Sequence, residues 1–200
     1  MTRIAIGVLL AVATVPTAAL RLGTPQLSAT VTTAPFLAAL HESGPVGILS
    51  TEEQQADIEK LACELDGKGD DDAQANVPLK GTYDLLYSMA IGGSNGKVGP
   101  FIGAVTQIIV DERNFINQVS LFGGAVVVQL YAQRDIIADN KIKVEFVETV
   151  FNIFGKEVKR QPTTGKGVWE QLYVERAADG SAALRVMRTP SLFVLQQRAS

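Results

Sequence analysis

The sequence contains very few residues of the kinds that build catalytic and metal sites. Its 200 residues include one cysteine, Cys63, and one histidine, His41. A single thiol cannot form an internal disulfide, and the lack of bridges in a chain of this size favours a reducing compartment. A nucleophilic site needs a base within reach, and a zinc site needs clustered Cys, His or carboxylate ligands. The sequence therefore predicts a protein that is not an enzyme and that holds no metal or catalytic cofactor.

Charged residues are also scarce. They make up 20% of the chain, the formal net charge is −3, and the basic residues are scattered along the sequence. A nucleic-acid surface would need basic residues clustered on one face, so the sequence predicts no nucleic-acid partner. The hydrophobic content of 46% is enough to build a core. At about 100–200 residues per domain, the length allows one domain plus extensions.

Acidic residues are absent from residues 1–40. Arg3 precedes the apolar run Ile4–Val15, which is the layout of a signal peptide and is too short for a bilayer span of about 20 residues. Residues 21–40 are rich in Ser, Thr and Ala, as organelle transit peptides are. We therefore predict a targeting presequence with a signal-like part (1–20) and a transit-like part (21–40), as for a plastid of secondary origin in an alga. A plain secretory signal followed by a flexible N-terminus is the alternative.

A helix is predicted in the next segment, residues 41–78. Ser50 and Glu53 fit the S-x-x-E capping box that starts a helix. An apolar stripe follows at i, i+3, i+4 and i+7, made of Ile58, Leu61, Ala62 and Leu65. Gly67 is a typical residue to end a helix. The pattern predicts a helix over Thr51–Asp66, with Cys63 as a small, partly buried residue beside the stripe.

The rest of this segment, Lys68–Pro78, is rich in Gly, Asp, Ala and Asn. A calcium loop needs alternating oxygen ligands, whereas the three acids at 70–72 are adjacent. A solvated linker is therefore the prediction here.

From Leu79 onward, apolar and polar residues alternate with period two, which predicts half-buried strands. Gly155–Gly167, which contains Pro162, interrupts the series and is predicted as a polar loop. The predicted strands are Leu79–Ala90, Phe101–Val110, Phe115–Phe122, Ala125–Gln133, Lys141–Phe154, Val168–Glu175, Ala183–Arg188 and Leu192–Gln197. Eight sequential strands with short connections favour a mainly β fold over 79–200, an antiparallel up-and-down barrel, because closure removes exposed sheet edges.

A closed eight-stranded barrel has an interior that side chains fill or that holds one small ligand. An aromatic and aliphatic lining with few polar groups favours an apolar ligand. Arg185 and Arg188 either orient a polar ligand head or point outward, and the outward position is favoured because Arg is rarely buried unpaired. The candidate lining residues are Tyr83, Tyr87, Phe101, Phe115, Tyr131, Phe146, Trp169 and Phe193.

Several segments resemble a known family. Leu79–Ser88 resembles the G-x-W-x-L-x-Y-T strand that opens the plastid lipid-associated protein (PAP/fibrillin) domain. Further similar segments follow in the same order, over about Thr51–Arg198: Gln107, Asn117 with Val119, Val144–Phe146, Trp169–Tyr173, Leu184–Arg188 and Leu192–Leu195. The chain departs from the family pattern at Tyr83, where tryptophan is usual, in the acidic link opened at 177–183, and at Thr189-Pro190, where a glycine is usual.

The resemblance implies a lipocalin-like fold and a non-catalytic, lipid-binding role at the thylakoid or plastoglobule of a chloroplast. The expected ligands are apolar lipids such as carotenoids or prenylquinones, which the protein would bind or shield. An interaction or assembly subunit of a photosynthetic membrane complex, with a filled barrel core, is the alternative. A carotenoid-converting enzyme of the lipocalin class is a third possibility, disfavoured by the missing barrel histidine.

Overall fold

The computed structural model describes residues 32–70, 73–90 and 95–199. By backbone contacts the chain divides into two units, residues 1–30 and 31–200, and every described residue belongs to the second. The signal-like segment and most of the transit-like segment lie outside the described residues, so the presequence stays a prediction.

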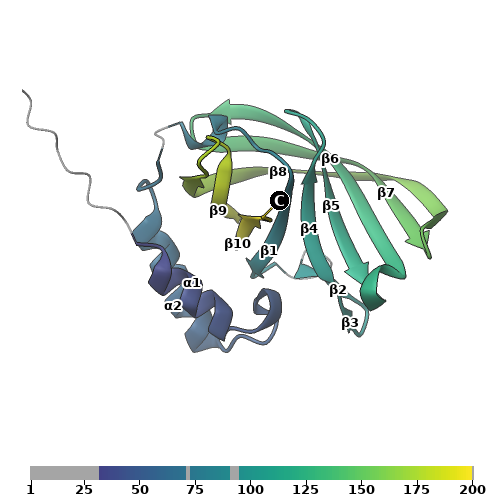
Figure 1. Ribbon diagram of the computed structural model, residues 1–200, viewed down its shortest axis with the longest axis horizontal. Helices are drawn as coiled ribbons and strands as arrows, with labels where there is room; N and C mark the ends of the chain where they lie inside the picture. The colour runs from purple at the N-terminus through teal and green to yellow at the C-terminus, as the bar shows by residue number, and fades with distance from the viewer. Residues whose placement is uncertain (1–31, 71–72, 91–94, 200) are drawn as a thin grey trace, which may run out of the picture. The chain divides into compact units, whose positions relative to one another are not determined.

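The second unit contains a closed antiparallel barrel of eight strands (Figure 1). In order around the barrel these are β1 (Thr82–Ser88), β10 (Ser191–Gln197), β9 (Ala182–Thr189), β8 (Lys156–Arg176), β7 (Lys141–Ile153), β6 (Val126–Ala138), β5 (Asn114–Leu121) and β4 (Ala104–Ile109). Two short strands, β2 (Lys97–Val98) and β3 (Phe101–Ile102), form a separate hairpin. The predicted mainly β, up-and-down barrel is confirmed.

The predicted polar loop at Gly155–Gly167 is wrong, because these residues form the first half of β8. They pair with β7 in register from Ile153 opposite Lys156 onward. Most of their side chains are exposed on both faces of this long hairpin, so no apolar alternation marks the strand. Pro162 lies opposite Glu148, next to a shift in register. Proline is tolerated in a sheet at such irregularities, because its nitrogen has no hydrogen to donate and a bulge leaves one residue without a hydrogen-bond partner in the ladder.

The barrel has an open end and a closed end. The β5–β6, β7–β8 and β9–β10 connections lie at the open end, and the β4–β5, β6–β7 and β8–β9 connections lie at the closed end. At the closed end, the short helix η2 (Gln74–Asn76) places Ala75 and Val77 in the interior cluster of buried residues. The Ala75 amide also donates to the carbonyl of Asp139 in the β6–β7 turn. The prediction of a solvated linker is therefore wrong for residues 73–78, because this segment plugs the barrel.

Helices cover the outside of the barrel beside β8, β9 and β10 (Figure 1). They are α1 (Ala34–Glu42), the short η1 (Pro45–Gly47) and α2 (Glu52–Leu65). The predicted stripe on α2 is confirmed, since its buried residues are Ile58, Ala62 and Leu65. The capping box lies one residue later than predicted and joins Thr51 and Gln54. The buried side chains of α1 and α2 pack on outward-facing residues of the barrel, namely Leu172, Leu184, Val186, Leu192 and Val194.

Two residues fix this helical layer to the barrel wall. A Cβ atom on Gly47 would lie 2.4 Å from the ring of Tyr87, and the φ of Gly47 is +73°. Only glycine therefore allows η1 to approach β1 so closely. On α2, Glu59 forms an ion pair with Arg188 of β9. Cys63, which was expected to be partly buried, is exposed.

The helix α1 starts inside the segment assigned to the presequence. Phe36 and Leu40 of this helix are buried among the side chains of α2 and the barrel. The predicted boundary at residue 40 therefore divides a helix that belongs to the compact unit. No helix among residues 32–70, 73–90 and 95–199 is long and apolar enough to cross a membrane.

Candidate functional site

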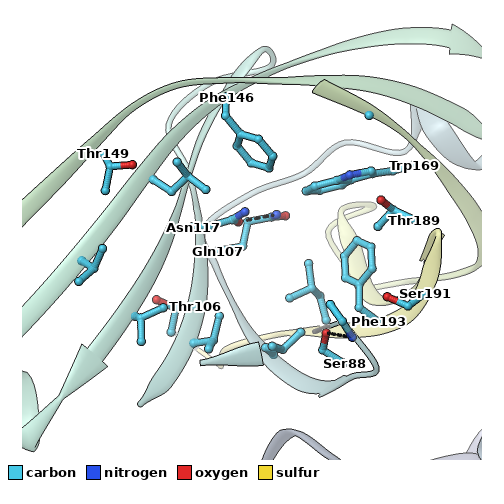
Figure 2. Close-up of a pocket in the computed structure, with 18 of the residues that line it drawn as sticks. Ser88, Thr106, Gln107, Asn117, Phe146, Thr149, Trp169, Thr189, Ser191 and Phe193 are labelled. Carbon is cyan, nitrogen blue, oxygen red and sulfur yellow. Dashed lines mark hydrogen bonds between the residues drawn. The ribbon is translucent and has the colours of Figure 1, made fainter. Parts of the chain in front are cut away.

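A cavity of about 410 Å³ occupies the half of the barrel interior nearest the open end (Figure 2). This volume is in the range of about 300–1,000 Å³ that is usual for small-molecule sites. Most of its walls are apolar, and Lys166 is the charged residue on its rim. The walls are formed by Leu85, Ser88, Ala90, Val98, Val105, Thr106, Gln107, Asn117, Val119, Val128, Leu130, Phe146, Thr149, Lys166, Gly167, Trp169, Thr189, Ser191, Phe193 and Leu195.

One side of the cavity is aromatic. The ring of Trp169, on β8, lies edge-on to Phe193 of β10 with the ring centroids 5.1 Å apart. The ring of Phe115, on β5, is tilted by 56° against that of Trp169, with the ring centroids 5.7 Å apart. Phe146 of β7 completes the aromatic wall, as Figure 2 shows. Edge-to-face ring pairs of this kind hold one another in fixed orientations, so this wall is a rigid apolar surface.

A polar relay crosses the floor of the cavity. The Nη1 group of Arg185 donates a hydrogen bond of 2.8 Å to Oε1 of Gln107. The Nε2 group of Gln107 in turn donates to Oδ1 of Asn117, at 3.1 Å (Figure 2). Gln107 and Asn117 lie opposite one another on the paired strands β4 and β5, and both line the cavity. The relay thus runs from a buried cation to an amide on the cavity surface.

Arg185 is 1% exposed, so the favoured outward position is wrong. Burial lowers its pKa to about 9, and the positive charge of Arg134 adds to the effect. The side chain still carries its charge at neutral pH. Among the described residues, Arg185 interacts with Gln107, with Sδ of Met187 and with the face of the Tyr83 ring, all of them uncharged. Its neighbours Leu184 and Val186 face the helices, so strand alternation turns Arg185 inward.

The structure brings some of the predicted lining residues together and separates others. Phe146, Trp169 and Phe193 line the cavity, and Phe115 packs against Trp169 without being part of the cavity wall. Tyr83 lies deeper, in the interior cluster toward the closed end, where its hydroxyl donates to the carbonyl of Ala182 and burial raises its pKa. The remaining predicted lining residues, Tyr87, Phe101 and Tyr131, are not part of the cavity wall.

Each of these three residues lies elsewhere for a local reason. A register shift between Leu85 and Tyr87 reverses the faces of β1, so Tyr87 packs on the helices while Ser88 lines the cavity. Phe101 belongs to the separate β2–β3 hairpin and is half exposed. Tyr131 is next to the cavity-lining Leu130, so it points to the outer face of β6.

The barrel wall has a gap beside the cavity. β1 pairs with β4 only over Thr82–Asp84, although each strand continues toward the open end along its other neighbour. Outside this gap a groove of about 930 Å³ runs between α1, η1, β1 and β4. Leu85 and Val105 line both the cavity and the groove. The two spaces therefore meet at these side chains.

Comparison with protein-family models shows the family to which the chain belongs. The model of the PAP_fibrillin family matches residues 35–187, which is more than half of the sequence. The chain belongs to the PAP_fibrillin family. PAP_fibrillin proteins are in general plastid-associated, lipid-associated and non-catalytic. No curated protein and no solved structure matches the chain.

The family segments also contain the site residues that composition and periodicity missed. Gln107 and Asn117 lie in two of the segments that resemble PAP_fibrillin motifs, and both are within the matched region. Neither is aromatic or charged, so a search for an apolar lining or for a catalytic group passes over them. The signal that could have identified them is a polar side chain at a strand position that faces the barrel interior. Among the described residues, no group of three or more His, Cys, Asp or Glu residues could hold a metal ion.

Proposed function

We propose that this PAP_fibrillin protein binds or shields, without catalysis, an apolar lipid whose polar head carries a carbonyl oxygen, and that prenylquinones are the ligand class. The site is the barrel cavity, and the place of action is the thylakoid or plastoglobule of a plastid. The observation that carries the proposal is the position of Asn117 at the end of the polar relay, inside an otherwise apolar cavity.

The orientation of the two amides follows from the chemistry of arginine. A guanidinium group only donates hydrogen bonds. The side-chain oxygen of Gln107 must therefore face Arg185, which turns its nitrogen toward Asn117. Asn117 then accepts through Oδ1, and its NH2 group is the part left for other partners. A cavity that presents N–H donors in this way selects a hydrogen-bond acceptor such as a carbonyl oxygen.

A carotenoid hydrocarbon fits this floor less well. It has no acceptor for the Asn117 amide, and an unsatisfied buried polar group costs about 1–3 kcal/mol. A quinone ring, in contrast, places a carbonyl oxygen on a flat apolar head that suits the wall formed by Trp169 and Phe193. The structure therefore favours prenylquinones over hydrocarbon carotenoids as the ligand.

The gap between β1 and β4 gives the tail of such a ligand a route out of the barrel. The cavity of about 410 Å³ suits a head group and a short tail, whereas the adjoining groove of about 930 Å³ adds a long apolar surface. We infer that the quinone head lies at Asn117 and that the prenyl tail passes Leu85 and Val105 into the groove under α1.

The alternative role, an assembly subunit with a filled barrel core, is less well supported. Such a protein would fill the barrel with its own side chains. The interior cluster includes Leu85, Trp169 and Leu195, which are themselves part of the cavity wall, so its side chains leave about 410 Å³ of the interior unfilled. The cavity at the open end argues for a ligand-binding barrel.

The test is lipid extraction from the purified full-length chain after incubation with a plastid lipid extract, followed by mass spectrometry. The expected result is enrichment of prenylquinones over carotenoids relative to the input, together with a higher melting temperature when quinone is added. If neither lipid is retained and neither raises the melting temperature, the proposal is wrong. Cell fractionation of a tagged chain tests the location, with thylakoid or plastoglobule fractions as the expected result.

A further inference from the structure

The open end of the barrel carries a cluster of exposed apolar side chains, here called the apolar rim. Its most exposed aromatic members are Phe122, which is 61% exposed, and Phe154, which is 81% exposed. The complete rim consists of Phe101, Ile102, Phe122, Ile153, Phe154 and Val158. Water-exposed aromatic side chains grouped at one end of a molecule mark a surface that contacts a partner.

These side chains come from three connections that meet at the open end, at the lower right of Figure 1. Phe122 belongs to η4 (Phe122–Gly124), between β5 and β6, and its ring lies 4.9 Å from that of Phe101 in the β2–β3 hairpin. Phe154 is in the β7–β8 turn, and its amide donates to the carbonyl of Ala125 in the β5–β6 connection. The apolar rim is thus continuous, and it borders the end of the barrel where Ser88, Ala90 and Ser191 line the cavity.

Two of these phenylalanines have an unfavourable backbone conformation. The φ angle is +52° at Phe122 and +48° at Phe154. This left-handed region suits glycine and asparagine, whereas a bulky side chain is strained there. Phe154 is 81% exposed and Phe122 is 61% exposed, so packing within the chain, which for Phe122 includes its ring contact with Phe101, leaves most of each residue in solvent. Folding alone would favour glycine or asparagine, so the aromatic side chains point to a role outside the folded chain.

The charge around the rim is opposite to that of the whole chain. The described segments at the open end (95–103, 120–126 and the paired β7–β8 residues 145–166) contain five basic and three acidic residues, although the formal net charge of the chain is −3. The basic residues are Lys97, Lys156, Lys159, Arg160 and Lys166, and the acidic residues are Glu145, Glu148 and Glu157. Arg160 pairs with both Glu157 and Glu148, and Lys166 lies opposite Glu145, so Lys97, Lys156 and Lys159 supply the excess positive charge.

The closed end makes a useful comparison. It also exposes aliphatic side chains, Val110, Ile136 and Ile137. Its connections at 110–114 and 134–141, however, contain four acidic and three basic residues, and no aromatic side chain. Among residues 32–70, 73–90 and 95–199, exposed aromatic side chains and an excess of positive charge therefore occur together at the open end.

We propose that the apolar rim docks onto an anionic lipid membrane, with Phe122 and Phe154 inserted among the lipids and the lysines at the headgroups. Apolar and aromatic side chains in the acyl boundary, together with lysines at anionic headgroups, are the combination that holds proteins at membrane surfaces. This inference rests on the proposed function and extends it, because docking at the open end brings the cavity next to the membrane that supplies its lipid.

The test is sedimentation of the full-length chain with vesicles of equal parts phosphatidylglycerol and phosphatidylcholine, and with vesicles of phosphatidylcholine alone. All variants share the N-terminal segment, so differences between them report on the open end. The double variant Phe122→Asn/Phe154→Asn is expected to partition at least about tenfold more weakly into both kinds of vesicle, from the apolar area lost. Asparagine tolerates a positive φ, so this variant keeps its fold, which its melting temperature checks.

Lys156→Glu/Lys159→Glu is expected to weaken binding about tenfold or more on the anionic vesicles only. The matched control at the closed end, Ile136→Ser/Ile137→Ser, is expected to bind as the unaltered chain does. The proposal is overturned if the phenylalanine variant binds vesicles normally, or if the closed-end control loses as much binding. Binding of a short-tailed quinone in solution, followed by Trp169 fluorescence, separates the two claims. If the unaltered chain does not bind the quinone, the proposed function alone is contradicted. If it binds the quinone and the phenylalanine variant binds vesicles as the unaltered chain does, the docking proposal alone is contradicted.

Discussion

Arg185 and Gln107 meet inside the barrel, where Nη1 of the guanidinium lies 2.8 Å from Oε1 of the amide. The two residues come from strands β9 and β4, which are not neighbours in the sheet. A buried arginine without a carboxylate partner is costly, since burial disfavours the charged form. Its position here has a specific consequence, because it fixes the direction of the amide relay that ends at Asn117 in the cavity. The proposed preference for a carbonyl-bearing lipid depends on this direction.

Replacing the hydrogen-bond donor at the end of the relay by an acceptor should therefore weaken the binding of a carbonyl-bearing lipid. In Asn117→Asp, a donor at the cavity surface becomes an acceptor, and we expect a three- to tenfold loss of affinity for a short-tailed prenylquinone, in line with about 1 kcal/mol for one hydrogen bond. Titration followed by fluorescence measures this change. The control is Gln118→Glu, an equivalent change on the outer face of β5, where Gln118 contacts Gln129. Equal effects of the two substitutions would contradict the role of Asn117.

The groove under α1 should make affinity depend on tail length. The unaltered chain is expected to bind a long-tailed prenylquinone more tightly than a short-tailed one. Ala104 lines the groove but not the cavity, so Ala104→Glu should remove the advantage of the long tail and leave short-tail binding unchanged. Ala56→Glu, on the exposed side of α2, is the matched control. Equal affinities for both tails in the unaltered chain would show that the tail does not use the groove.

The helix α1 is expected to be part of the same cooperative unit as the barrel. Phe36 is 1% exposed and belongs to the cluster between helices and barrel. Phe36→Ala should lower the free energy of unfolding by about 3–5 kcal/mol, the usual loss for a buried phenylalanine. Leu49→Ala, at a residue that is 71% exposed, should change it by less than about 0.5 kcal/mol. Urea unfolding distinguishes the two outcomes, and a small effect at Phe36 would mean that α1 is not held against the barrel.

Stability should fall at high pH, in part through Tyr173. Burial raises the pKa of this phenol from its ordinary value of 10.0 to about 12, and the carboxylates Glu175 and Asp70 add to the effect. The folded state therefore holds its proton more tightly than the unfolded state does, so the stabilisation is complete below about pH 10 and is lost as the pH rises to about 12. Urea unfolding between pH 9 and pH 11 should show that the free energy of unfolding declines less steeply with pH in Tyr173→Phe than in the unaltered chain. An identical decline in both proteins would contradict the assignment.

The order of the strands could be predicted from the sequence because most strands of the barrel have one buried and one exposed face. This alternation located all eight strands of the barrel, but it placed the start of β8 at Val168 instead of Lys156. It failed at residues 156–167, where neither face of the β7–β8 hairpin is covered and polar residues occupy both. Alternation also cannot show the register shift near Leu85, which reverses the faces of β1 and moves Tyr87 from the predicted lining to the helical layer.

The candidate site could be predicted only in part for the same kind of reason. Trp169 and Phe193 follow regular alternation and lie where they were expected. Tyr131 lies in a strand with apolar residues on both faces, so its direction could not be read from the pattern. Arg185 was expected to face outward, because isolated charge is usually excluded from a core. Its partner Gln107 is 78 residues away in the sequence, and only the closed barrel brings them together.

The central claim is that the barrel interior binds a quinone-headed lipid, and the sole tryptophan of the chain, Trp169, lies in the wall of that cavity. The most direct measurement is the quenching of its fluorescence during titration with a short-tailed prenylquinone, for the unaltered chain, Val128→Phe and Val127→Phe. Val128 lines the cavity, and its neighbour Val127 faces outward. The expected result is saturable quenching in the unaltered chain. The affinity should be at least about tenfold weaker in Val128→Phe, because the added ring fills the cavity, and unchanged in Val127→Phe. Quenching that does not saturate, or that Val128→Phe leaves unaltered, would contradict binding inside the barrel.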